Sequence, residues 1–149
     1  MHPFDLRAAV FAKHAQHVVL IHFPIALFIA GVAFDFLAHW KKQRLLAAAA
    51  YYNFFAAALT TIPVLITGML AWQWQLEGQR LKGILLMHLV VGCVSSVLIW
   101  VVWLMHRRAQ REEGAIRPGY RLPVEAVAAA VVVLTGHLGG FLSGVNVPS

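Results

Sequence analysis

The chain has 149 residues, of which 60% are hydrophobic and only 12% are charged. A soluble domain carries about 25% charged residues, so this composition excludes an ordinary soluble domain and indicates a membrane protein. The net charge of +6 would suit nucleic acid if basic side chains shared a face with aromatic residues, but here they lie between apolar runs. The single Cys93 excludes a disulfide framework.

Four apolar stretches are each long enough to cross about 30 Å of hydrocarbon as a helix. They span residues 18–38, 45–72, 83–105 and 124–145. The connections are a basic turn at 40–44, a turn at 73–82 and a polar loop at 107–122. Short connections make consecutive helices antiparallel. The sequence therefore predicts an all-α membrane protein, a single four-transmembrane-helix up-down-up-down bundle in which the first and third helices are diagonal, as are the second and fourth.

The basic residues predict how this bundle is oriented. Of the 12 Lys and Arg residues, three lie in the first connection and five in the third. Basic loops remain in the cytoplasm, so both termini are expected outside, N-out and C-out. The first apolar stretch is too long for a signal-peptide core and lacks a small-residue cleavage site. We therefore expect it to be a transmembrane helix.

Histidine is the unusual component of the spans. Six of the eight histidines lie within the spans or at their ends: His17, His22, His39, His88, His106 and His137. Ionisable side chains at membrane depth are costly and usually functional. At 1.5 Å per residue, His22, His88 and His137 lie about 9, 9 and 6 Å from the midplane, all on the outer side. The sequence thus predicts a layer of three histidines from three helices.

The third span places its small and polar residues on the same face as His88. Steps from His88 to Gly92, Ser95, Ile99 and His106 return within about 40° of one direction, so this face is expected to point inward. In the second span, Thr67 is expected to hydrogen-bond to the histidine layer.

Two further features adjoin this layer. Glycines 136, 140 and 144 recur every four residues beside His137 and permit close approach of a helix or a flat ligand. Pro24 removes a backbone donor and is expected to bend the first helix near its start.

Imidazole is the common protein ligand of haem iron, zinc and copper. Because diagonal helices can present two axial nitrogens at one depth, the preferred hypothesis is that His22 and His88 bind haem b. His137 is the alternative ligand, His17 is a further partner, and the site is completed by Thr67, Gly92 and Gly140. A second hypothesis is that these histidines bind a copper or zinc ion. The third is that the histidines only hydrogen-bond between helices and hold no cofactor.

At the cytoplasmic ends, His39 and His106 form a second possible pair. Both adjoin Lys or Arg, so their side chains are expected to reach water, which disfavours a second haem. Asp35, taken as the one acidic residue inside a span, is expected either to hydrogen-bond to His39 or to belong to a proton path.

Three segments carry a family resemblance: HVVLIHFPIAL at 17–27, LMHLVVG at 86–92 and TGHLGGFLSGV at 135–145. They resemble the bacterial membrane proteins called domain of unknown function 2231, and the resemblance covers essentially the whole chain. It implies four transmembrane helices, places His22, His88 and His137 in recurring segments, and implies the bacterial cytoplasmic (inner) membrane. Fusions of relatives to cytochrome c or Rieske domains imply a redox role on the outer side. Residues 142–147 depart from the usual pattern.

These observations predict a b-type membrane cytochrome or electron-transfer subunit with its haem in the outer half of the bundle. It would connect a quinol or quinone with an outer redox protein such as a cytochrome c. The alternative is an accessory or assembly subunit of a larger membrane complex without a cofactor. A proton-conducting protein or transporter using Asp35 is disfavoured because no two-half repeat is found. The sequence contains none of the residue patterns that hydrolysis or phosphoryl transfer requires, so these reactions are not expected.

Overall fold

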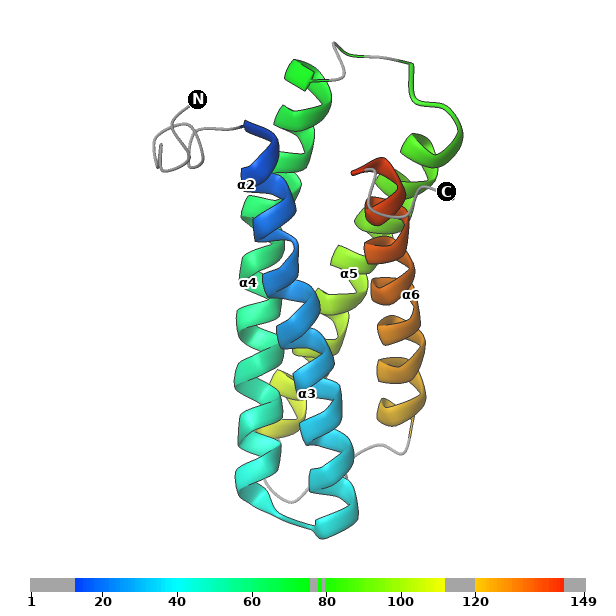
Figure 1. The fold of residues 1–149 in the computed structure, drawn as a ribbon. Coiled ribbons are helices and arrows are strands. Elements are labelled where there is room, and N and C mark those ends of the chain that lie inside the picture. Colours follow the sequence, from blue (N-terminus) through cyan, green and yellow to red (C-terminus); the bar gives the residue numbers. More distant parts are fainter. Residues whose placement is uncertain (1–12, 76–77, 79, 112–119, 144–149) are drawn as a thin grey trace.

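The computed structural model describes residues 13–75, 78, 80–111 and 120–143, and its regular elements there are helices (Figure 1). The helices are α2 (Lys13–Leu20), α3 (His22–Lys41), α4 (Arg44–Gln75), α5 (Gly83–Arg111) and α6 (Arg121–Leu142). Four stretches are long and apolar enough to cross a membrane: Gln16–Lys41, Arg44–Trp74, Gly83–Arg111 and Arg121–Leu142. The predicted four-span, all-helical fold is confirmed.

The four long helices pack as adjacent pairs. α3 contacts α4 and α6, and α5 also contacts α4 and α6, so α3 is diagonal to α5 as predicted. α3 and α5 both terminate at one end of the bundle. We call it the basic end, because Lys41, Arg44 and Arg111 lie there. The opposite end, where α2 begins and α6 finishes, is the histidine end (Figure 1).

The first span is interrupted near its start, as Pro24 predicts. α2 ends at Leu20 and α3 begins at His22, with Ile21 between them. Proline lacks the N–H that would bond to the carbonyl four residues earlier, here that of Leu20. The amide of Ile21 still donates to the carbonyl of His17 at 3.0 Å, and Ile21 has helical φ and ψ of −60° and −26°, so the chain keeps its helical course across this interruption.

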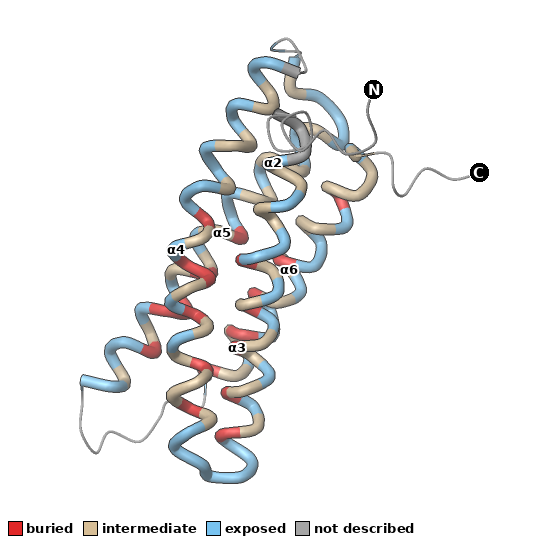
Figure 2. Tube along the Cα trace, turned by 60° about the vertical axis from the view of Figure 1, so that its left-hand side comes forward, coloured by how far each residue is buried: buried red, intermediate tan, exposed pale blue. Residues whose placement is uncertain are grey.

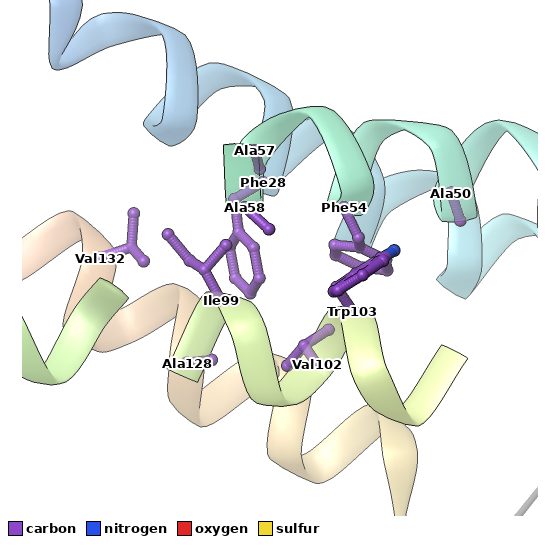
Figure 3. Packing of buried hydrophobic residues seen from close by; sticks show 10 residues of the cluster. All are labelled: Phe28, Ala50, Phe54, Ala57, Ala58, Ile99, Val102, Trp103, Ala128 and Val132. Atoms are coloured by element: carbon purple, nitrogen blue, oxygen red, sulfur yellow. The ribbon is translucent and has the colours of Figure 1, made fainter. Parts of the chain in front are cut away.

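The core is made of aromatic and small side chains in the middle of the bundle. Gly31 lets α3 approach α4 closely, since a Cβ there would lie 2.7 Å from a ring carbon of Phe54. The ring of Phe28 packs on that of Phe54 with centroids 5.3 Å apart. The core cluster is drawn in Figure 3 and comprises Phe28, Ala50, Phe54, Ala57, Ala58, Ile99, Val102, Trp103, Ala128 and Val132.

Outside this core the helices expose apolar side chains. Figure 2 shows buried positions in the interior of the bundle and exposed ones on its outer surface. Large exposed residues such as Phe36, Val97 and Val127 are 56%, 62% and 61% accessible. In a bundle of membrane length, lipid is the solvent that makes such a surface favourable.

All four spans extend beyond the predicted bounds at the basic end. α3 continues to Lys41 instead of ending at 38, and α4 begins at Arg44 instead of 45. α5 continues to Arg111 instead of ending at 105, and α6 begins at Arg121 instead of 124. Basic side chains are compatible with a helix C-terminus because they complement its dipole, so hydropathy alone placed the end of α5 too early. The fourth helix ends at Leu142, and Gly144 lies outside the described residues.

Candidate functional site

At the histidine end, the polar face of α5 is turned toward α6. The hydroxyl groups of Ser95 and Thr135 lie 2.6 Å apart, and Ser95 also donates to the carbonyl of Val131 at 3.3 Å. A Cβ at Gly92 would lie 3.6 Å from the methyl group of Thr135. The inward orientation predicted for this face is therefore confirmed, and α6 is the helix that it contacts.

His88 is the α5 histidine on this face, and it is half-buried. Its ring lies against α6 so closely that a Cβ at Gly139 would be 3.1 Å from its Cε1 atom. Its Nδ1 atom is buried and has no hydrogen-bond partner among the described residues. A buried polar atom without a partner indicates either a cost to the fold or a missing ligand.

His17 is held by the second span. Its Nδ1 atom lies 3.1 Å from the hydroxyl oxygen of Thr67, and its ring lies over Gly68. The hydroxyl oxygen of Thr67 also lies 2.8 Å from the carbonyl oxygen of Pro63 and 3.1 Å from that of Val64, so it can donate to its own helix while it accepts from Nδ1 of His17. Thr67 thus bonds to His17, whereas the sequence prediction paired it with the layer of His22, His88 and His137.

His22 is exposed on α3, near the break between α2 and α3. Its Nδ1 atom lies 2.7 Å from the carbonyl oxygen of Val18 and must donate, because a carbonyl can only accept. This bond fixes the neutral tautomer in which Nε2 carries the free lone pair. Ligating histidines in proteins characteristically have this arrangement, with one nitrogen donating to a carbonyl and the other binding a metal.

His137 and the glycines of α6 complete the residues predicted for this end. His137 is exposed, with its ring edge-on to Phe141 at a centroid distance of 4.9 Å. A Cβ at Gly136 would lie 3.4 Å from Ile25 of α3, so this glycine allows close helix packing. Gly140 is half-buried, and its carbonyl accepts from the hydroxyl of Ser143.

The structure brings these outer residues together in pairs and not as one cluster. His88 meets Gly139, and His17 meets Thr67. In the described part of the chain, no hydrogen bond or ring contact joins His22 to His88. The one group of three metal-binding side chains found among the described residues lies at the other end.

That group belongs to a buried polar cluster at the basic end, formed by Asp35 of α3, His106 of α5, and Arg121 and Glu125 of α6. Each of the four side chains is almost fully buried, and Glu125 is completely so. Asp35 lies about 9 Å along α3 from the end of that helix at Lys41. The cluster therefore lies inside the membrane-spanning segments but close to their basic end.

Two contacts organise this buried polar cluster. The guanidinium of Arg121 donates from Nη2 to Oδ1 of Asp35. Nε2 of His106 lies 2.8 Å from Oε1 of Glu125, and Nε of Arg121 is 3.7 Å from the same oxygen. The His106 ring also packs on Phe54 of α4, with centroids 4.6 Å apart. The cluster thus joins three helices through charged or hydrogen-bonded side chains, and the fourth through a ring contact.

The hydrogen bonding of the cluster is incomplete. Oε2 of Glu125 and Nε of Arg121 are buried and have no hydrogen-bond partner among the described residues. Asp35, His106 and Glu125 each offer one ligand atom, and these atoms all lie within 4.8 Å of one another. Two carboxylates and an imidazole in this arrangement have the donor atoms and spacing of a metal site.

Several expectations for this end were wrong. His106 is buried against Glu125 and does not reach water, whereas His39 is exposed as predicted. Asp35 bonds to Arg121 of another helix and is not the one acidic residue inside a span, because Glu125 lies in α6. The sequence does contain a signal for this cluster, because Arg121 is followed four residues later by Glu125 at the start of an apolar run.

Comparison with known proteins identifies the family. A family model described as "Predicted membrane protein (DUF2231)" matches residues 13–146, which confirms the resemblance expected from the three segments. No curated protein and no solved structure matches the chain.

Proposed function

We propose that this chain, which belongs to the DUF2231 family of predicted membrane proteins, is a b-type haem-binding electron-transfer protein. The observation that carries the proposal is His88, whose buried Nδ1 atom has no hydrogen-bond partner among the described residues. Burial of a polar atom without a partner is costly, and ligation to iron would remove that cost. The contact with Gly139 holds the ring beside the glycines of α6.

His22 is the second residue that would hold the haem iron. Its hydrogen bond to the carbonyl of Val18 leaves Nε2 as the ligating nitrogen. His22 belongs to α3 and His88 to α5, and these helices are diagonal in the bundle. His137 is the alternative ligand, and His17, held by Thr67, is a further imidazole on α2.

The haem-binding proposal includes a location and partners. The protein lies in a bacterial cytoplasmic membrane with its basic end in the cytoplasm and both termini outside, following the positive-inside rule. The haem then lies in the outer half of the bundle. In that position it exchanges electrons between a quinol or quinone and an outer redox protein such as a cytochrome c, alone or within a larger complex. Lipid covers the exposed apolar surface.

The test is the absorption spectrum of protein purified in detergent after expression with ample haem. Wild type should show a Soret band that shifts on reduction, and His88→Ala should lose it. His39→Ala is the matched control, because His39 is exposed at the opposite end and should leave the band unchanged. Free imidazole should restore the band to His88→Ala if the ring acts as an iron ligand. A colourless wild-type protein would refute the proposal.

A second candidate is an accessory or assembly subunit without a cofactor. It is favoured by the side-chain hydrogen bonds between Ser95 and Thr135 and between His17 and Thr67, since polar residues here already join helices. The extensive exposed apolar surface suits contact with other membrane subunits as well as with lipid. This candidate predicts a colourless protein in which His88→Gln leaves folding and association with partner subunits intact.

A further inference from the structure

We infer that the buried polar cluster is a binding site for a divalent transition-metal ion, in which the metal and the Arg121 guanidinium compete for the same carboxylates. The ligands are Asp35, His106 and Glu125, which come from three different helices. This site lies at the basic end and does not depend on whether haem is bound at the histidine end.

The ligand atoms are already gathered. One oxygen from each of Asp35 and Glu125 and one nitrogen from His106 lie within 4.8 Å of one another, although their residues are far apart in the sequence. With metal-ligand bonds of about 2.0–2.2 Å, a tetrahedral ion holds its ligand atoms about 3.3–3.6 Å apart, so binding would draw these side chains together by up to about 1.5 Å. The Phe54 ring packs against the imidazole and restricts its movement.

A second observation points to a ligand. Glu125 is 0% exposed, yet its Oε2 atom has no hydrogen-bond partner in the described part of the chain. Oε1 of the same carboxylate already lies 2.8 Å from His106 and 3.7 Å from Arg121. A buried carboxylate oxygen without a donor is costly, and a cation is the partner that most strongly offsets this cost.

Charge counting explains why Arg121 and the metal exclude each other. Arg121 carries one positive charge, and the carboxyl groups of Asp35 and Glu125 offer at most two negative charges. Adding a divalent ion with Arg121 in place would leave an excess positive charge in a buried site, which is unfavourable. With Arg121 displaced, the two carboxylates neutralise the ion. α4 has no charged residue after Arg44 and so adds no other counter-charge.

The position of Arg121 allows its side chain to leave the buried polar cluster. Arg121 is the first residue of α6, directly after the exposed Tyr120, and its Nε atom has no hydrogen-bond partner among the described residues. The guanidinium is held mainly by its bond to Asp35. A long side chain at a helix end can turn toward the aqueous boundary while its stem remains against apolar surface. Release of Arg121 therefore requires no movement of α6.

The donor set selects the class of metal. An imidazole favours zinc, iron or nickel over magnesium or calcium, whereas copper(I) prefers sulfur ligands. No cysteine belongs to the cluster, and the single Cys93 is exposed on α5. We take Zn²⁺ as the probe because it accepts mixed nitrogen and oxygen ligands in tetrahedral geometry.

The experiment is calorimetric titration of Zn²⁺ into full-length protein that has been treated with a chelator in detergent. Wild type should bind one ion at this site, and Glu125→Gln should weaken binding by at least about tenfold. Arg121→Gln should tighten binding by about tenfold or more, because it removes the competing cation. Arg121→Lys retains the positive charge and should stay closer to wild type. His39→Ala, exposed at the same end, is the control that should change nothing.

A purely structural cluster makes the opposite prediction for Arg121. Loss of the arginine would then disorder the site, and zinc affinity would fall or stay unchanged, which would overturn the inference. X-ray absorption of zinc bound to wild type is a second test, independent of whether any variant folds. A spectrum that shows zinc bound by one imidazole and by oxygen ligands would support the proposed site. A shell of several imidazoles, or no stoichiometric zinc, contradicts it.

Discussion

The ion pair between Asp35 and Arg121 should be the most sensitive polar contact of the bundle. Asp35 is 2% exposed and Arg121 5%, so Asp35→Asn would leave a buried guanidinium without its main counter-charge. Breaking a buried pair in this way typically costs about 3–5 kcal/mol. Glu125 still provides an oxygen 3.7 Å from Arg121, and the arginine side chain can turn toward the aqueous boundary, so we expect a loss no greater than the lower value, about 3 kcal/mol.

The double variant Asp35→Asn/Arg121→Gln tests whether this loss comes from the charge. It removes both charges and should regain about 2 kcal/mol relative to Asp35→Asn alone. The assay is the free energy of unfolding in mixed micelles, followed by far-ultraviolet circular dichroism during titration with dodecyl sulfate. Arg108→Gln, exposed on α5, is the control and should change stability by less than about 0.5 kcal/mol. The reasoning would be refuted if the free energy of unfolding of Asp35→Asn were within about 1 kcal/mol of wild type. It would also be refuted if the double variant were no more stable than Asp35→Asn.

Two further predictions concern packing and orientation. Gly31→Ala should destabilise the bundle by about 1–3 kcal/mol, because its Cβ would lie 2.7 Å from the fully buried Phe54 ring. Gly92→Ala, whose Cβ would meet only Thr135 at 3.6 Å, should be tolerated, and equal losses would contradict the packing described. For orientation, single cysteines at Lys42 and at Lys82, in a Cys93→Ala background, should react with an impermeant maleimide in intact cells only at 82. The reverse pattern would invert the proposed topology.

Much of the fold was predictable because periodicity and span length are local properties. His88, Gly92 and Ser95 share one face of an ideal helix, and that face does pack on α6. Pro24 likewise predicts the break between α2 and α3 from its missing donor. The rotation of the first span about its axis was not predictable, because its mostly apolar surface does not distinguish the lipid-facing side from the interior.

The buried polar cluster was missed for two physical reasons. His106 was expected at the surface because Arg107 and Arg108 follow it, but each helical residue turns by 100°, so the basic side chains point elsewhere. The fall in hydropathy at Arg121 predicts a loop there, although the charge of Arg121 is neutralised by Asp35, 86 residues earlier. A contact between residues so distant in sequence is a property of the tertiary fold.

The most direct test of the proposed function is the haem content of the purified wild-type protein, measured as the pyridine haemochrome and expressed per chain. The proposal predicts haem b bound stoichiometrically in wild type and in His39→Ala, and lost from His88→Ala in which the bundle remains folded. Wild-type protein without haem, or His88→Ala that retains its full haem content, would contradict the assignment of His88 as an iron ligand.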